Sequence, residues 1–177
     1  CGAILAEAGA EITKVESIDR PDGARVGDPV LFAGLNDRKA HRTIDLRSAS
    51  GRAELTALVR DADVVVEASR PRALAALGLV AEQLVAGHDG PGVWVSITGH
   101  GRSSPRIAYG DDAAVAGGLV DHGDDGPRFR GDALADPLSG LTAAAAALEL
   151  LADGEGGLVE VTMAAVAAAH APRHPIT

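Results

Sequence analysis

Aromatic residues and cysteine are scarce in this sequence. Phe, Trp and Tyr together make up 2% of the 177 residues, and Cys1 is the single cysteine. One cysteine excludes a disulfide framework and a zinc ribbon. Hydrophobic residues still make up 46% of the chain, so a core of Ala, Val, Leu and Ile with closely packed glycine can form. The composition therefore predicts a folded aliphatic domain rather than a disordered chain.

Long apolar runs and an excess of basic residues are also missing. No run reaches the roughly 18 residues of a membrane span, and 25 acidic against 16 basic residues give a formal net charge of −9. Nucleic acids and anionic membranes are bound by basic surfaces, so neither is an expected partner. No signal peptide is visible at the start. Together with the single cysteine, this indicates a reducing compartment, and we expect a cytoplasmic protein.

Both ends of the sequence look like cuts in a longer chain. The sequence starts without Met inside an amphipathic segment, and prolines interrupt its last residues, 169–177. We therefore expect one domain over residues 1–168 and a linker or truncated end over residues 169–177.

Helical and strand patterns alternate along this domain. Residues 63–67 and 93–97 are apolar runs typical of strands covered on both faces. The alternation predicts an α/β fold with a doubly wound parallel sheet. The other expected strands are 11–16, 42–46 and 158–162, and the expected helices are 2–8, 50–60, 73–77, 81–86, 113–119, 138–152 and 163–169.

Two segments have the composition of loops. Residues 17–36 are rich in Gly, Pro and Asp and predict a long loop, and residues 121–127 predict an acidic, glycine-rich turn. The acids of this turn and His122 could bind a hard cation, but their spacing is not that of an EF-hand. A solvated turn explains them, and we expect no metal site.

Ligands of open parallel sheets bind beyond the carboxyl ends of the strands. Three polar strand ends are candidates here, at Glu16, at residues 67–70 and at residues 98–101. An acid in the position of Glu16 can bind a ribose hydroxyl, but no G-x-G-x-x-G fingerprint precedes it. A solvated strand end is the simpler interpretation of Glu16, and a dinucleotide site is the alternative.

One basic cluster interrupts the acidic sequence, in residues 36–47. It contains Arg38, Lys39, Arg42 and Arg47. Local cations in a negative chain favour a phosphate-bearing ligand held at one place. Surface ion pairs in a solvated loop are the alternative explanation.

Asp136 is followed by Pro137 at the start of a long alanine-rich segment. This pair is typical of an N-cap and a first helical position. A carboxylate at a helix start can also be a nucleophile when it faces a cleft. The sequence contains no Gly-x-Ser-x-Gly motif.

A series of segments, taken in order, resembles the class III CoA-transferase family (CaiB/BaiF type), which includes formyl-CoA and carnitine CoA-transferases and α-methylacyl-CoA racemase. The resemblance lies in the order and spacing of these segments across nearly the whole chain. They are residues 1–16, 36–39, 51–52, 62–67, 70–71, 77–79, 96–101, 110–112, 117–119, 131–136 and 156–163.

The resemblance implies a Rossmann-like large domain, a small domain and an interlocked homodimer of ring-shaped chains. Residues 1–168 would be the front portion of the large domain, lacking its first strand. The implied substrates are an acyl-CoA and a carboxylic acid acceptor. Coenzyme A is then a substrate and a covalent intermediate, and no cofactor is permanently bound.

Asp136 matches the catalytic aspartate of the family. The resemblance implies that its carboxylate attacks the thioester carbonyl, giving an aspartyl–acyl anhydride and then an aspartyl-CoA thioester. The residues that correspond to the family's CoA-binding strip, with two further basic candidates, are Ile44, Asp45, Leu46, Arg47, Ala68, Ser69, Arg70, Arg38 and Lys39.

The sequence departs from the family pattern at several CoA contacts. The usual Asn-Phe pair of the family is Ala68-Ser69 here. At two positions where the family frequently has arginine, this sequence has Ser17 and Ala76. Each departure removes a CoA contact. Basic residues that could compensate are Arg38, Lys39, Arg42 and Arg70.

Three alternatives to CoA transfer stay open. The racemase branch uses the His of a Gly-His-Asp motif, which reads Gly110-Asp111-Asp112 here, so transfer is favoured over racemisation. A non-catalytic CoA-binding relative and an ordinary nucleotide-binding domain are the others. In both of these, Asp136 would have a structural role and no catalytic role.

Overall fold

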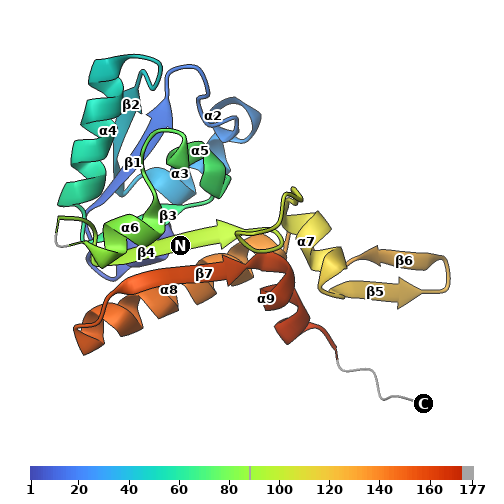
Figure 1. The fold of residues 1–177 in the computed structure, drawn as a ribbon. Helices are drawn as coiled ribbons and strands as arrows, with labels where there is room; N and C mark the ends of the chain where they lie inside the picture. The colour runs from blue at the N-terminus through green and yellow to red at the C-terminus, as the bar shows by residue number, and fades with distance from the viewer. Residues whose placement is uncertain (88, 173–177) are drawn as a thin grey trace.

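The computed structural model describes residues 1–87 and 89–172. Helices and strands alternate as predicted, and Figure 1 shows the parallel strands flanked by helices. The elements in chain order are α1 (Gly2–Glu7), β1 (Ile12–Ser17), α2 (Ala24–Gly27), α3 (Pro29–Asn36), β2 (Lys39–Ile44), α4 (Ala49–Asp61), β3 (Val64–Glu67), α5 (Pro71–Ala75), α6 (Ala81–Ala86), β4 (Val93–Thr98), α7 (Gly110–Ala116), β5 (Val120–Gly123), β6 (Gly126–Phe129), α8 (Ala135–Asp153), β7 (Gly157–Thr162) and α9 (Met163–His170).

The parallel strands form two groups rather than one continuous sheet. β3, β4 and β7 make a three-stranded parallel sheet in that order, and β1 pairs with β2, also in parallel. β5 and β6 form an antiparallel hairpin that extends beyond α7 (Figure 1). The α/β class with parallel strands flanked by helices is confirmed. Among the described strands, β1 and β3 each have one hydrogen-bonded neighbour, so each has one unpaired edge.

Aliphatic layers cover both faces of the three-stranded sheet. On one face, Val93 and Val95 pack against Ala143 and Ala147 of α8, and all four residues are fully buried. On the other face, Trp94 packs in a cluster that includes residues of α4 and α6. Alternate residues of β4 therefore face opposite layers, as the period of a strand requires. The small side chains of α8 allow the helix to lie close to the sheet.

β3 is less enclosed than its apolar sequence predicts. Its middle residue Val66 is 39% exposed, whereas four consecutive residues of β4 are buried. The prediction of a strand covered on both faces holds for β4 and is wrong for Val66. The difference follows from position, because β4 has strands on both sides and β3 has one described neighbour.

The long loop predicted over residues 17–36 contains two helices, α2 and α3. Asp28 caps α3, because its side chain accepts a hydrogen bond of 2.9 Å from the Leu31 N–H, and Pro29 starts the helix. Asp followed by Pro is a common start signal for a helix. The loop prediction is therefore wrong for residues 24–27 and 29–36.

Two other predicted boundaries are also wrong. β2 begins and ends earlier than the predicted strand 42–46, because the chain leaves the strand at Asp45 and turns into α4, which Ser48 caps. The predicted acidic turn 121–127 is most of a hairpin, whose backbone ladder runs from Val120–Phe129 to Gly123–Gly126. Only residues 124–125 turn between the two strands.

The last helix runs through His170, so the start of the predicted tail 169–177 is helical. Residues 173–177 of that tail lie outside the described residues. Within residues 1–87 and 89–172, no helix combines the length and the apolar character needed to cross a lipid bilayer.

Candidate active site

A cavity of about 520 Å³ lies at the carboxyl ends of β3 and β4. Its walls come from the segments after these two strands and from the starts of α8 and α9. This is where an open parallel sheet is expected to bind ligands. The lining residues are 68–70, Arg72, 97–99, 101–109, Asp136 and Met163.

Asp136 lies in the first turn of α8 and is exposed to this cavity. The helix begins at Ala135 with Leu134 as its N-cap, so the prediction that Asp136 is the cap is wrong. The turn closes earlier because the Asp136 N–H donates a hydrogen bond of 2.9 Å to the Ala133 carbonyl. Pro137 is tolerated there, since N–H groups of a first turn have no partner within the helix. The carboxylate is therefore available for chemistry.

Gly110, the first residue of α7, allows the Asp136 carboxylate to lie against the α7 backbone. A Cβ atom at Gly110 would be 2.7 Å from Asp136 Oδ2 and 2.7 Å from the Ala133 Cβ. Real Cβ atoms do not approach other heavy atoms this closely. The absence of a side chain at this position thus leaves the space that the carboxylate occupies.

Replacing Gly110 with Ala is expected to displace the Asp136 carboxylate. Because misplacing a reacting group by about 1 Å can cost about 10²-fold in rate, we expect Gly110→Ala in the full-length protein to slow turnover by that order. Gly34→Ala in α3 is the matched control, since nothing lies within 4 Å of a Cβ there. Steady-state kinetics of both variants measures the effect. Equal turnover in the two variants would contradict the assigned contact.

The environment of Asp136 raises the pKa of its carboxyl above the ordinary value. Burial is the larger cause, because a partly desolvated site disfavours the charged form, and the negative charge of Asp111 is the second. A carboxylate with a raised pKa is more basic and a better nucleophile once ionised.

Arginines give the cavity a positive lining in a chain that is acidic overall. Arg70, Arg72, Arg102 and Arg106 line it, together with Asp136 as the one acidic side chain of the lining. Arg102 is paired with Glu67 and Glu82. No ion pair of Arg70, Arg72 or Arg106 occurs with an acid in the described residues. The cavity therefore suits a ligand that carries several negative charges.

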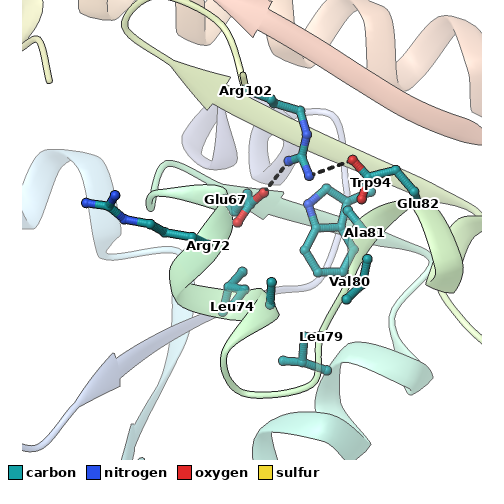
Figure 2. A pocket seen from close by; sticks show the side chains of 10 residues that line it. Glu67, Arg72, Leu74, Leu79, Val80, Ala81, Glu82, Trp94 and Arg102 are labelled. Atoms are coloured by element: carbon teal, nitrogen blue, oxygen red, sulfur yellow. Dashed lines mark hydrogen bonds and ion pairs between the residues drawn. The ribbon is translucent and has the colours of Figure 1, made fainter. Parts of the chain in front are cut away.

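Arg102 is held by a buried network beside a second, smaller cavity of about 150 Å³ (Figure 2). Its guanidinium donates to Glu67 Oε1 at 2.9 Å, to Ser96 Oγ at 2.8 Å and to Glu82 Oε1 at 3.0 Å. The Glu67 side chain is 4% exposed and that of Arg102 13%. Trp94 lies beside this network in Figure 2. The network joins the end of β3 to the segment after β4 and so supports the wall of the larger cavity.

The structure brings one predicted CoA-binding segment, residues 68–70, to the cavity of Asp136. Ala68, Ser69 and Arg70 come directly after β3. The Ser69 hydroxyl donates a hydrogen bond of 3.1 Å to Glu67 Oε2, so its side chain is engaged with the strand end. Arg70 is exposed, and it is the cation of this segment best placed to meet an anionic ligand.

The second predicted segment, residues 44–47, lies at the end of β2 and is not part of the cavity lining. Ile44 is 1% exposed and belongs to the core. Asp45 and Leu46 begin the turn into α4. Arg47 forms ion pairs with Asp19 at 3.0 Å and Asp45 at 3.7 Å, and its side chain is 74% exposed. Among the described strands β2 pairs only with β1, so this segment belongs to the two-stranded sheet and not to the sheet whose strand ends line the cavity.

Lys39 and Arg38 lie near the amino end of β2, opposite to the carboxyl ends of the strands. The Lys39 ammonium donates a hydrogen bond of 2.9 Å to Asn36 Oδ1. Burial, and then the charge of Lys14, lower the pKa of Lys39. Arg38 is exposed. The structure does not bring these two residues to the cavity of Asp136.

Glu16 is buried in an ion-pair cluster at the end of β1, so its interpretation as a solvated strand end is wrong. Lys14 contacts it at 2.8 Å and Arg25 at 3.0 Å, and the Asp22 N–H donates to it at 3.1 Å. The guanidinium of Arg25 also stacks over Phe32, 4.3 Å from the ring centroid. With its oxygens engaged in these contacts, Glu16 anchors the segment before α3 rather than offering an acceptor for a ribose.

The Glu16 cluster predicts a pH-dependent contribution to stability. Hydrogen bonds from Arg25 and Lys14 lower the pKa of Glu16 to about 2. A carboxyl with a lowered pKa stabilises the fold above its ordinary pKa and loses that contribution as the pH falls toward the lowered one. At about 1.4 kcal/mol per pKa unit, Glu16→Gln is expected to cost on the order of 3 kcal/mol near neutral pH, with the difference from wild type vanishing as the pH falls toward 2.

Denaturant unfolding of the full-length protein at several pH values measures this contribution. Glu11→Gln is the control, because Glu11 is exposed on the same part of the chain and should change stability by less than about 0.5 kcal/mol. A Glu16→Gln cost that did not shrink in acid would contradict the ion-pair explanation.

Several residues of the site were missed by sequence reasoning. Arg102, Arg106 and Tyr109 come from the segment between β4 and α7, and Met163 begins α9. The signal that could have found them is the polar strand end at residues 98–101, since the loop after such an end lines the ligand site. Within the described part of the chain, no group of three or more His, Cys, Asp or Glu side chains is placed to hold a metal ion.

The fold and the site together define an α/β domain with an arginine-lined cavity at the strand ends, in which the Asp136 carboxylate is exposed. The sequence model of CoA-transferase family III matches residues 1–176, and the chain belongs to this family.

Its relatives include an acyl-CoA transferase from Fusarium pseudograminearum, 33% identical over 92% of this chain and 41% of the relative. A succinyl-CoA–D-citramalate CoA-transferase from Chloroflexus aurantiacus is 31% identical over 91% of this chain and 44% of the relative. The solved structure of a CaiB/BaiF family protein from Brucella suis superposes with a TM-score of 0.83 at 29% identity, covering 95% of this chain and 50% of that one. The chain thus spans about half the length of the proteins that it matches.

Proposed function

We propose that the protein transfers coenzyme A from an acyl-CoA thioester to a carboxylic acid, with Asp136 as the nucleophile. The observation that carries this proposal is the position of the Asp136 carboxylate, exposed in an arginine-lined cavity of a family III chain. Two relatives are named as CoA-transferases that act on small carboxylic acids, and these names support the same class of reaction.

Each proposed step exchanges one acyl bond for another. The Asp136 carboxylate attacks the thioester carbonyl, and CoA leaves as the thiolate, which gives a mixed aspartyl–acyl anhydride. The thiolate then attacks the aspartyl carbonyl and releases the donor acid, leaving an aspartyl-CoA thioester. The acceptor carboxylate attacks this thioester and expels CoA thiolate again, which forms a second anhydride. CoA thiolate finally attacks the acceptor's carbonyl, which yields the new acyl-CoA and regenerates Asp136.

The charges of the cavity support CoA as the shared ligand. CoA carries phosphate and pyrophosphate groups, which arginine side chains bind well. Arg70 and Arg72 come after β3 and line the cavity without an ion pair to an acid among the described residues. We propose that these two arginines replace the CoA contacts that are lost at Ala68, Ser69 and Ala76. Residues 44–47 are proposed to bind the part of CoA farther from Asp136.

Racemisation is disfavoured because no histidine lines the cavity among the described residues. The Asp111 carboxylate, which stands in the predicted racemase motif, accepts a hydrogen bond from the Ala133 N–H. It is engaged in holding a loop, which supports transfer rather than an exchange of α-protons.

The expected assembly is part of the same proposal. We propose that a parallel strand from outside residues 1–177 pairs with β1 and β3, and the unpaired edges of these strands support it. The full-length protein is proposed to be a cytoplasmic homodimer with no permanently bound cofactor.

Intact-mass spectrometry of the full-length protein with a panel of acyl-CoAs tests the proposed reaction. The expected result is a covalent adduct that maps to Asp136 and is removed by hydroxylamine, which cleaves anhydrides and thioesters. CoA binding in calorimetry without any adduct would instead indicate a non-catalytic CoA-binding relative. The absence of both would reject CoA chemistry for this domain.

A further inference from the structure

The loop that leads into α8 has an unusual backbone at Ala133. Its φ angle is 45°, and Ala133 is the one non-glycine residue with a positive φ among those the structure describes. The left-handed conformation is unfavourable for a residue with a side chain. Such a conformation persists only where neighbouring groups hold it. The Ala133 carbonyl accepts the hydrogen bond of the Asp136 N–H, so the position of Asp136 depends on this backbone.

The group that holds Ala133 comes from a distant part of the chain. Asp111, in the first turn of α7, accepts a hydrogen bond of 2.9 Å from the Ala133 N–H through its Oδ1 atom. Asp111 is half-buried. Through this bond α7 fixes the backbone two residues before α8, while the missing side chain of Gly110 beside it leaves space for the Asp136 carboxylate. Neighbouring residues of one turn therefore meet both the main chain and the side chain of the nucleophile's segment.

We propose that Asp111 is a positioning residue for the Asp136 nucleophile, acting through the hydrogen bond that its carboxylate accepts from Ala133. The inference rests on the proposed function of Asp136. It explains why an acidic residue stands beside a carboxylate nucleophile, since an anion accepts a stronger hydrogen bond from an N–H group than a neutral oxygen does.

The charge of Asp111 has a second effect, on the ionisation of Asp136. Burial raises the pKa of Asp136, and the negative charge of Asp111 adds to that rise. The other charged or titratable groups that line the cavity with Asp136 are Arg70, Arg72, Arg102, Arg106 and Tyr109.

Two substitutions separate the hydrogen bond from the charge. Asp111→Asn keeps an oxygen that can accept from the Ala133 N–H and removes the charge, whereas Asp111→Ala removes both. In the full-length protein we expect Asp111→Ala to lower kcat about tenfold to a hundredfold, as a displaced nucleophile should, with KM for the acyl-CoA nearly unchanged. Asp111→Asn should retain most of kcat. Asp125→Asn, in the exposed turn of the hairpin, is the control and should match wild type.

A readout that does not require activity distinguishes this inference from the proposed function. Carboxyl NMR of protein labelled at aspartate, with the Asp136 signal assigned by Asp136→Asn, gives the pKa of Asp136 directly. We expect that pKa to fall in Asp111→Asn and to remain unchanged in Asp125→Asn. The Ala133 amide should be protected from hydrogen exchange in wild type and Asp111→Asn, and unprotected in Asp111→Ala.

Several outcomes overturn the inference. Wild-type kcat and amide protection in Asp111→Ala would show that Asp111 holds nothing. Equal kcat losses in Asp111→Asn and Asp111→Ala would show that the accepting oxygen is not what matters. If Asp111→Ala does not fold, an Ala133 amide that exchanges freely in wild type overturns the inference. If wild type forms no adduct while the NMR results are as expected, the proposed function fails and the positioning of Asp136 stands.

Discussion

Asp136→Asn is expected to lower CoA transfer by the full-length protein about a thousandfold or more, with no covalent adduct. Removing a catalytic nucleophile typically costs at least this much, and an amide of the same shape cannot form the anhydride. CoA affinity should change little, because the cations that line the cavity are untouched. Turnover and isothermal calorimetry of the same preparation measure the two quantities.

The matched control for Asp136→Asn is Asp125→Asn, which removes the same charge from an exposed turn. Wild-type turnover in Asp136→Asn would reject Asp136 as the nucleophile. A loss of CoA affinity as large as the loss of turnover would assign Asp136 to binding rather than to covalent catalysis.

Arg102→Met is expected to cause the largest loss of stability among single substitutions near the site. It leaves the Glu67 carboxylate, 4% exposed, without its cation, and an unpaired buried charge costs about 3 to 5 kcal/mol. The Glu67→Gln and Arg102→Met double variant should recover much of this loss, since it removes both charges. The midpoint of urea unfolding measures the stability of wild type, of Arg102→Met and of the double variant.

Arg130→Met is the control for Arg102→Met, because its ion pair with Asp121 is exposed and such pairs contribute less than about 1 kcal/mol. Equal losses in Arg102→Met and Arg130→Met would show that burial does not decide the strength of these pairs. A double variant no more stable than Arg102→Met would contradict the explanation through an unpaired Glu67.

The α/β class could be predicted because the strands of the core are locally unambiguous. β4 is a short apolar run between polar segments, and a run of this kind fits a central strand. The α3 helix was missed because its signal, Asp28 before Pro29, lies among residues typical of loops. The two-stranded hairpin was missed for a related reason, because its short strands contain Gly123, Gly126 and Pro127, which are typical of turns.

Asp136 could be identified as a candidate, but its surroundings could not. The hydrogen bond between Asp111 and Ala133 joins α7 to the loop before α8, and no local pattern predicts which segments meet. The same holds for Arg102 and Glu67, which come from the segment after β4 and the end of β3. Lys39 shows the converse, since its neighbours in sequence place it in a basic cluster while its strand puts it at the far end.

The connection from β4 to β7 has a consequence for how the molecule acquires its chemistry. The two strands are hydrogen-bonded neighbours, yet the chain between them contains α7, the hairpin and α8, and with them Gly110, Asp111 and Asp136. Closing so long a segment before the strands can pair makes this a slow, late event in folding. The residues that place the Asp136 carboxylate are therefore all contained in the one long loop that the pairing of β4 with β7 closes.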